Sequence, residues 1–178
     1  MKKIYITGCA KSGTTMLANL MTAFDVQVFP GEAFLTSFFT SKYDVCKRHK
    51  DFLFSEDLPY LTLWSCYAYV QQWGVRILNI NRKKDDVLKS EGGYVSEKRY
   101  DACQSQKGWF GDVITMDVTF EEIIDDPVGM QASMQIYFPD LVPIASWEDY
   151  PDFVPQEHWD VVKDQGPRYG PRKLGEKK

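Results

Sequence analysis

One segment near the amino end constrains the fold of this chain more than any other, because it joins a strand, a tight loop and a helix. Residues 4–7, Ile-Tyr-Ile-Thr, read as a buried strand, and residues 8–15, GCAKSGTT, follow directly. Gly8 and Gly13 have the G-x-x-x-x-G spacing of a loop that cradles a phosphate. Apolar residues recur at helical spacing from Gly13 to Phe24, so a helix should begin where the loop ends.

Three further apolar stretches predict strands after this unit. The first, residues 26–29, is expected to end at the turn pair Pro30-Gly31, which leaves Glu32 directly behind the strand. The other two lie at residues 75–80 and 113–118. The chain therefore supplies enough strands for a small sheet.

Helical stretches separate these strands. The aromatic-rich residues 34–73 are predicted to form two helices joined by the charged residues 46–51, with Gly74 as the carboxyl cap. A short helix is expected over 84–90, and the polar residues 94–111 are compatible with either a helix or a mobile loop.

Two capping signals follow the last predicted strand. Thr119 with Glu122 three residues later forms a capping box, and Asp126 with Pro127 starts a further helix. The apolar face of that helix is predicted to consist of Met130, Met134 and Tyr137. Strands that alternate with helices predict an α/β fold, a three-layer sandwich with a parallel central sheet whose ligand lies beyond the carboxyl ends of the strands.

The chain divides by composition into a domain and an extension. Residues 1–138 are predicted to form the α/β domain. Residues 139–178 hold six of the nine prolines and end in GPRYGPRKLGEKK. We expect this extension to pack on the surface of the same domain.

Charge and cysteine usage exclude several classes of function. A formal net charge of -4 argues against a nucleic-acid partner, which needs a dense basic surface. The four cysteines have no metal-ligand spacing, which favours reduced thiols and a cytoplasmic protein. Polar residues interrupt every apolar segment, so no membrane partner is expected, and the apolar run that ends at Lys11 is too short for an export signal.

The loop lacks the residues that handle a nucleoside triphosphate with magnesium. Thr14 stands where a triphosphate-binding loop places its lysine, and the lysine lies inside the loop at Lys11. The strand at 75–80 ends in Asn81-Arg82 and has no aspartate for a metal. A sulfuryl group carries less charge than a phosphoryl group, so lysine and backbone dipoles can handle its transfer without a metal.

Two stretches carry a resemblance to a known family. Residues 10–17, AKSGTTML, resemble the 5'-phosphosulfate loop of the sulfotransferases that use 3'-phosphoadenosine 5'-phosphosulfate (PAPS), although Ala10 replaces a frequent proline and Met16 a frequent tryptophan. Residues 81–90, NRKKDDVLKS, are similar to the family's 3'-phosphate motif, in which an arginine is followed eight residues later by a serine. A weaker match, TFEEIIDDP at 119–127, corresponds to a structural segment.

The resemblance implies a P-loop NTPase-like sulfotransferase fold and a set of ligands for PAPS and its product PAP. The 5'-phosphate is expected to contact Ala10, Lys11, Ser12, Gly13, Thr14 and Thr15. Arg82 and Ser90 would hold the 3'-phosphate, and Arg172-Lys173 approximates a carboxyl-terminal motif that reaches the same phosphate in the family. Trp64 or Tyr100 could stack on the adenine.

Two residues compete for the role of catalytic base, and Lys11 is expected to stabilise the leaving phosphate. Glu32 resembles the glutamate that bacterial and carbohydrate sulfotransferases place after the second strand. His49 is the alternative, because cytosolic aryl and steroid sulfotransferases use a histidine. His158 is a weaker candidate.

The sequence thus predicts a PAPS-dependent sulfotransferase that acts without metal on a hydroxyl of a small-molecule or carbohydrate acceptor. A homodimer could complete the acceptor pocket. Two alternatives remain open: a small P-loop kinase that uses ATP and magnesium, and a protein that binds PAP or another nucleotide without turnover.

Overall fold

A parallel sheet forms the centre of the molecule. The structure is a computed structural model that describes residues 3–49, 52–55, 58–90 and 95–150. Among these residues five strands pair in the order β2-β3-β1-β4-β5, and every pair is parallel. The strands are β1 (Ile4–Thr7), β2 (Val28–Ala33), β3 (Val45–Arg48), β4 (Arg76–Asn81) and β5 (Ile114–Thr119).

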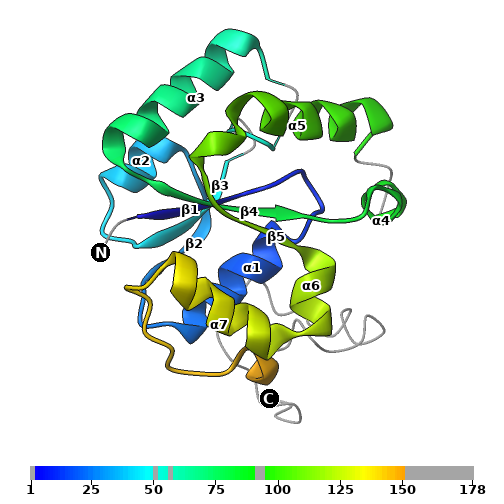
Figure 1. Ribbon diagram of the computed structural model, residues 1–178. Coiled ribbons are helices and arrows are strands. Elements are labelled where there is room, and N and C mark those ends of the chain that lie inside the picture. The colour runs from blue at the N-terminus through cyan, green and yellow to red at the C-terminus, as the bar shows by residue number, and fades with distance from the viewer. Residues whose placement is uncertain (1–2, 50–51, 56–57, 91–94, 151–178) are drawn as a thin grey trace.

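Helices cover both faces of the sheet, which confirms the predicted three-layer α/β sandwich (Figure 1). One layer contains α1 (Thr14–Leu20), α6 (Phe120–Asp125) and α7 (Pro127–Tyr137). The opposite layer contains α2 (Leu35–Phe39), α3 (Tyr60–Trp73) and α5 (Glu97–Phe110), and the short α4 (Lys84–Lys89) lies beyond the end of β4. Three 3-10 turns complete the described elements: Met21–Ala23, Gly111–Val113 and Trp147–Asp149.

Each face of the sheet has its own hydrophobic core, because successive strand side chains point to opposite faces. Ile4 and Ile6 pack with residues of α1 and α7, whereas Tyr5, between them, packs with residues of α2 and α3. All three are fully buried. The strand that leads into the loop is therefore held from both sides.

The predicted helix caps are confirmed. Gly74 ends α3 with φ 60, the left-handed conformation that favours glycine. Thr119 and Glu122 form both halves of the capping box of α6, and Pro127 stands at the start of α7. The polar stretch whose structure the sequence left open is the helix α5.

The prediction of two helices across residues 34–73 is wrong in the middle of that stretch. α2 has only five residues, and the residues predicted as a charged connection include three of the four residues of β3, which lies between β1 and β2. The strand is four residues long, and two of them are Lys47 and Arg48. Its pairing with both neighbours stabilises it, and neither local apolar pattern nor length identifies it.

The second strand also differs from its prediction. β2 continues through Pro30 and Gly31 to Ala33, so Glu32 lies within the strand and pairs in register with Lys47. Proline lacks a backbone N–H, and it is tolerated here because β2 is an edge strand. Tyr137, the last residue of α7, is exposed, so the predicted apolar face of this helix is wrong at that position.

The first part of the predicted extension packs into one of the cores. Trp147 is fully buried, and its ring lies 6.4 Å from that of Phe24 in an edge-to-face arrangement. Residues 151–178 lie outside the described residues. No helix in the described ranges is long and apolar enough to cross a membrane.

We predict that Trp147→Ala lowers the free energy of unfolding by about 3–5 kcal/mol, because it leaves a large cavity in the core. Urea denaturation measures this change. The exposed Trp109→Ala is the matched control and should alter stability by less than about 0.5 kcal/mol. Equal stability of both variants would show that Trp147 is not part of the core.

Candidate active site

The loop between β1 and α1 has the backbone shape of an anion-binding turn. Gly13 has φ 105, and Lys11 has φ 67, which is unusual for a residue other than glycine. The backbone N–H of Ser12 donates to the Cys9 carbonyl (3.1 Å). The first N–H groups of α1 have no acceptors within the helix, so the end of the loop offers donors to a negatively charged ligand.

Ser12 supports the same interpretation. Its side chain is almost fully buried, and its hydroxyl has no hydrogen-bond partner among the described residues. A buried hydroxyl without a partner is unfavourable, and a phosphate oxygen in the loop would satisfy it. Lys11 and Thr15 are exposed at the same loop, where they can reach a ligand.

Both loop glycines are required by close contacts. A Cβ atom on Gly8 would lie 2.3 Å from the carbonyl oxygen of Ile80 in β4 and 2.7 Å from Ser12 Oγ. A Cβ atom on Gly13 would lie 2.9 Å from the ring of Phe120 at the start of α6. The loop therefore packs directly against the ends of β4 and β5.

A small apolar cluster covers the other side of the loop. Cys9 and Ala10 pack with Val87 of α4 and Cys103 of α5, and all four are buried. A hydrogen bond with Cys103 lowers the pKa of the Cys9 thiol, although burial acts in the opposite direction. Ala10 thus serves as a packing residue as well as a predicted loop residue.

Lys47, which the sequence analysis did not identify, connects the loop to Glu32. The Lys47 ammonium donates to Thr15 Oγ1 (2.9 Å) and lies 3.2 Å from a Glu32 carboxylate oxygen. Only 13% of the Lys47 side chain is exposed. The sequence gives no indication of this role for Lys47, because β3 was not predicted. The register of β3 with β1 places Lys47 beside Ile6, just before the loop.

Arg48 is a second positive group that the sequence analysis overlooked. It is buried, and its Nε donates to the carbonyl of Gly8 (3.3 Å). Burial lowers the pKa of Arg48, and the charge of Glu32 opposes this effect. With Lys11 and Lys47, it surrounds the loop with positive charge, which favours an anionic ligand.

Both predicted bases lie at the same edge of the sheet as the loop. Glu32 is close to the end of β2, with 42% of its side chain exposed. His49 directly follows β3, and its ring centroid lies 4.0 Å from that of Phe34. The two strands are neighbours, so Glu32 and His49 flank the same part of the edge.

Arg82 follows β4 and is positioned by an aromatic ring. Its guanidinium carbon lies 4.4 Å from the centroid of Phe120, the residue that also packs against Gly13. Its Nε is buried and has no partner among the described residues. Phe120 thus connects the predicted 3'-phosphate arginine to the phosphate loop, a role that the sequence analysis did not assign to it.

The remaining predicted ligands have varied surroundings. Ser90 caps the carboxyl end of α4, and its hydroxyl donates to the Val87 carbonyl (2.6 Å). Tyr100 lies beside Arg82, because its hydroxyl donates to the Arg82 carbonyl (3.0 Å). Trp64 packs with aromatic side chains of α3 and α5, in a pocket that contains no loop residue. The predicted residues Arg172, Lys173 and His158 lie outside the described residues.

Comparison with known proteins supports the fold. The structure is similar to the crystal structure of the mouse sulfotransferase SULT7A1 complexed with PAP, with a TM-score of 0.51 and 14% sequence identity. The match covers 78% of this chain and 58% of the mouse chain, so this chain spans little more than half of that protein. No protein-family model matches the sequence, and a search of the curated proteins finds no relative. No group of three or more metal-ligating side chains occurs within the described ranges.

We predict that Gly8→Ala displaces the loop and destabilises the protein by about 1–3 kcal/mol, because the new Cβ collides with the Ile80 carbonyl. Thermal unfolding and amide NMR shifts of the loop residues measure the two effects. Gly108→Ala is the control, because a Cβ at this position of α5 meets no atom within 4 Å. A Gly8→Ala protein with unchanged stability and loop shifts would contradict the packing described above.

Proposed function

We propose that this protein transfers a sulfuryl group from PAPS to a hydroxyl of a small-molecule or carbohydrate acceptor. One observation carries the proposal: a phosphate loop whose lysine lies inside the loop is joined through Phe120 to an arginine with a buried, unpartnered Nε. The loop and Arg82 both lie at the carboxyl ends of the parallel strands. Together they can bind a nucleotide that carries one phosphate at the 5' position and another at the 3' position of its ribose. The fold shared with a PAP-bound sulfotransferase is consistent with this ligand.

The proposed ligands divide between the two phosphates. The 5'-phosphate accepts from the first N–H groups of α1, from the Ser12 hydroxyl and from the Lys11 ammonium. Thr15 can donate its hydroxyl proton to the same phosphate, because its oxygen already accepts from Lys47. Arg82 binds the 3'-phosphate and thereby distinguishes PAPS from ATP.

The transfer is a direct displacement at sulfur. The acceptor oxygen forms a bond to sulfur, the bond between sulfur and the phosphate oxygen breaks, and the electron pair leaves with PAP. A base takes the proton of the acceptor hydroxyl. Lys11 and Lys47 stabilise the negative charge that develops on the transferred group and on the leaving phosphate.

An ATP-dependent kinase is less compatible with the described residues. Such enzymes hold magnesium with an aspartate at the end of a strand, and Asp117 near the end of β5 is the residue that could take this role. It already accepts from Lys107 (2.5 Å), Asn79 (2.7 Å) and Asn81 (2.6 Å). These hydrogen bonds neutralise the charge of Asp117 and connect its carboxylate to α5. We therefore infer that Asp117 has a structural role.

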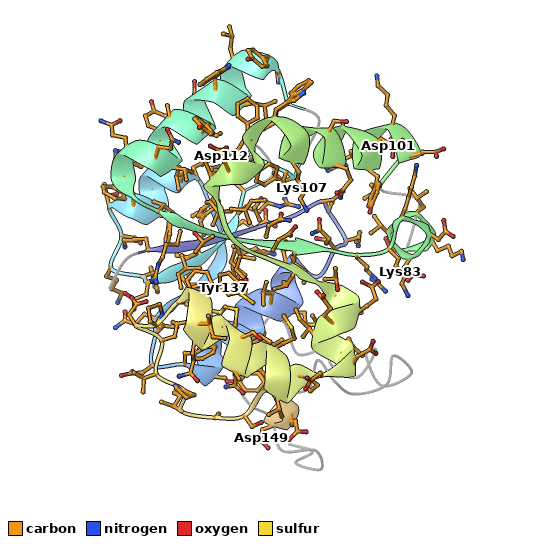
Figure 2. All side chains as sticks on the ribbon, in the orientation of Figure 1. Lys83, Asp101, Lys107, Asp112, Tyr137 and Asp149 are labelled. Carbon is orange, nitrogen blue, oxygen red and sulfur yellow. The ribbon has the colours of Figure 1, made fainter. Side chains whose placement is uncertain are left out.

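The nucleotide preference is the first test of the proposal. Calorimetric titration should show that PAP binds without metal and more tightly than ADP, and that Arg82→Ala weakens PAP binding by about 10- to 100-fold. Lys83→Ala is the control, since Lys83 is an exposed neighbour at the start of α4 (Figure 2). Tighter binding of ATP with magnesium would support the kinase alternative instead.

The identity of the base is the second test. If Glu32 is the base, Glu32→Gln should lower the rate of sulfuryl transfer by about 10²- to 10⁴-fold, with PAP affinity retained. His49→Asn should then transfer the sulfuryl group at a rate close to that of the parent. The opposite result assigns the base to His49, and a parent protein that binds PAP but turns over no acceptor would contradict the enzymatic proposal.

A further inference from the structure

A hollow of about 590 Å³ lies between α3 and α5, on the layer that contains Lys107 and Asp112 and opposite the layer of Tyr137 (Figure 2). Its walls are formed by the aromatic residues Tyr60, Trp64, Tyr67, Trp109 and Phe110. No residue of the phosphate loop, of β2 or of β3 lines it. The hollow is therefore separate from the site proposed for PAPS.

The aromatic rings of this pocket leave much of their surface uncovered. Tyr60 is 55% exposed, Trp64 is 45% exposed and Trp109 is 64% exposed. A buried aromatic core would cover these rings, yet of the aromatic lining residues Phe110 is the buried one. Three large exposed rings around one hollow indicate a binding surface rather than a packing cluster.

Several pairs of these rings stand nearly perpendicular to each other, whereas Phe110 is tilted at 45° to Tyr60 and at 53° to Tyr67. The planes of Tyr60 and Trp64 meet at 80°, those of Tyr60 and Trp109 at 75°, and those of Trp64 and Tyr67 at 78°. Ring centroids in these pairs are 5.4–6.2 Å apart. Rings at right angles to each other line the hollow together, so one small group inside it can contact more than one ring.

The charge of the pocket favours a cationic ligand. Asp112 is exposed, and its carboxylate accepts from the Tyr67 hydroxyl (2.9 Å), with no ion pair to it among the described residues. The hydrogen bond with Asp112 raises the pKa of Tyr67, which keeps the phenol neutral. The one cation in the lining, Lys107, forms its ion pair with Asp117 (2.5 Å).

We propose that this pocket binds an alkylammonium group, such as the trimethylammonium of a choline-like or methylated-lysine ligand. The faces of Tyr60, Trp64 and Trp109 attract the cation through their π-electrons, and Asp112 provides the opposite charge. The methyl groups contact the ring surfaces, which are otherwise exposed to water. The pocket shares no residue with the ligands proposed for PAPS, so either assignment can fail without the other.

The test uses two probes of nearly the same shape. Choline carries a trimethylammonium group, and 3,3-dimethyl-1-butanol replaces the charged nitrogen with carbon. Titrations followed by the NMR signals of the tryptophan indole N–H groups should show that choline binds about tenfold more tightly than the neutral alcohol. Equal binding of the two probes would overturn the proposal, as would stronger binding of methyl glucoside or no saturable binding of choline.

Substitutions at two exposed residues of the pocket test whether choline binds there. Asp112→Asn keeps an oxygen that can accept from Tyr67, and it should remove most of the preference for choline. Trp109→Leu should weaken choline binding by about tenfold. Tyr69→Ala, which removes an exposed aromatic ring of α3 outside the pocket, should bind choline like the parent. Thermal unfolding confirms that each variant is folded, and unchanged choline binding by folded Asp112→Asn and Trp109→Leu proteins would also overturn the proposal.

Discussion

The contact between Gly8 and the carbonyl of Ile80 is the constraint on which the rest of the site depends. It brings the loop against the end of β4, and no residue with a Cβ fits in the space. Because β1 pairs with both β3 and β4, the same contact places the loop between Lys47 on one side and Arg82 on the other. At the start of α1, Gly13 packs against the ring of Phe120, and the same ring contacts the Arg82 guanidinium. The positions of the proposed phosphate ligands thus depend on the close packing of Gly8 and Gly13.

Only part of the positive charge at this end of the sheet is paired within the protein. Lys47 is largely buried, and its two partners, Glu32 and Thr15, belong to β2 and to the loop. Arg48 is buried beneath the loop, where the Gly8 carbonyl accepts its hydrogen bond. Removing charges from water is costly unless partners replace the solvent, and a bound phosphate would be a further partner for this group of cations. A single carboxylate that pairs with Lys47 leaves the edge with an excess of positive charge.

Much of the fold could be predicted from local patterns, whereas the strand β3 could not. The loop, the Gly74 cap and the capping box at Thr119 each depend on residues within one turn of the chain, so the sequence identifies them directly. The four residues of β3 include two cations, and their strand conformation depends on pairing with β1 and β2, which are distant in sequence. Lys47 and Arg48 were missed for that reason. Phe120 was read as part of a structural segment, because its contacts with Gly13 and Arg82 arise only when β4 and β5 are side by side.

A crystal structure of the protein with PAP would locate both phosphates of the bound nucleotide. We expect the 5'-phosphate within hydrogen-bond distance of the Ser12 hydroxyl and the Lys11 ammonium, and the 3'-phosphate on the Arg82 guanidinium. We also expect Lys47 to keep its contact with Thr15 and to face the position of the transferred group. PAP bound elsewhere, or bound with its 3'-phosphate away from Arg82, would contradict the assignment of this edge as a PAPS site.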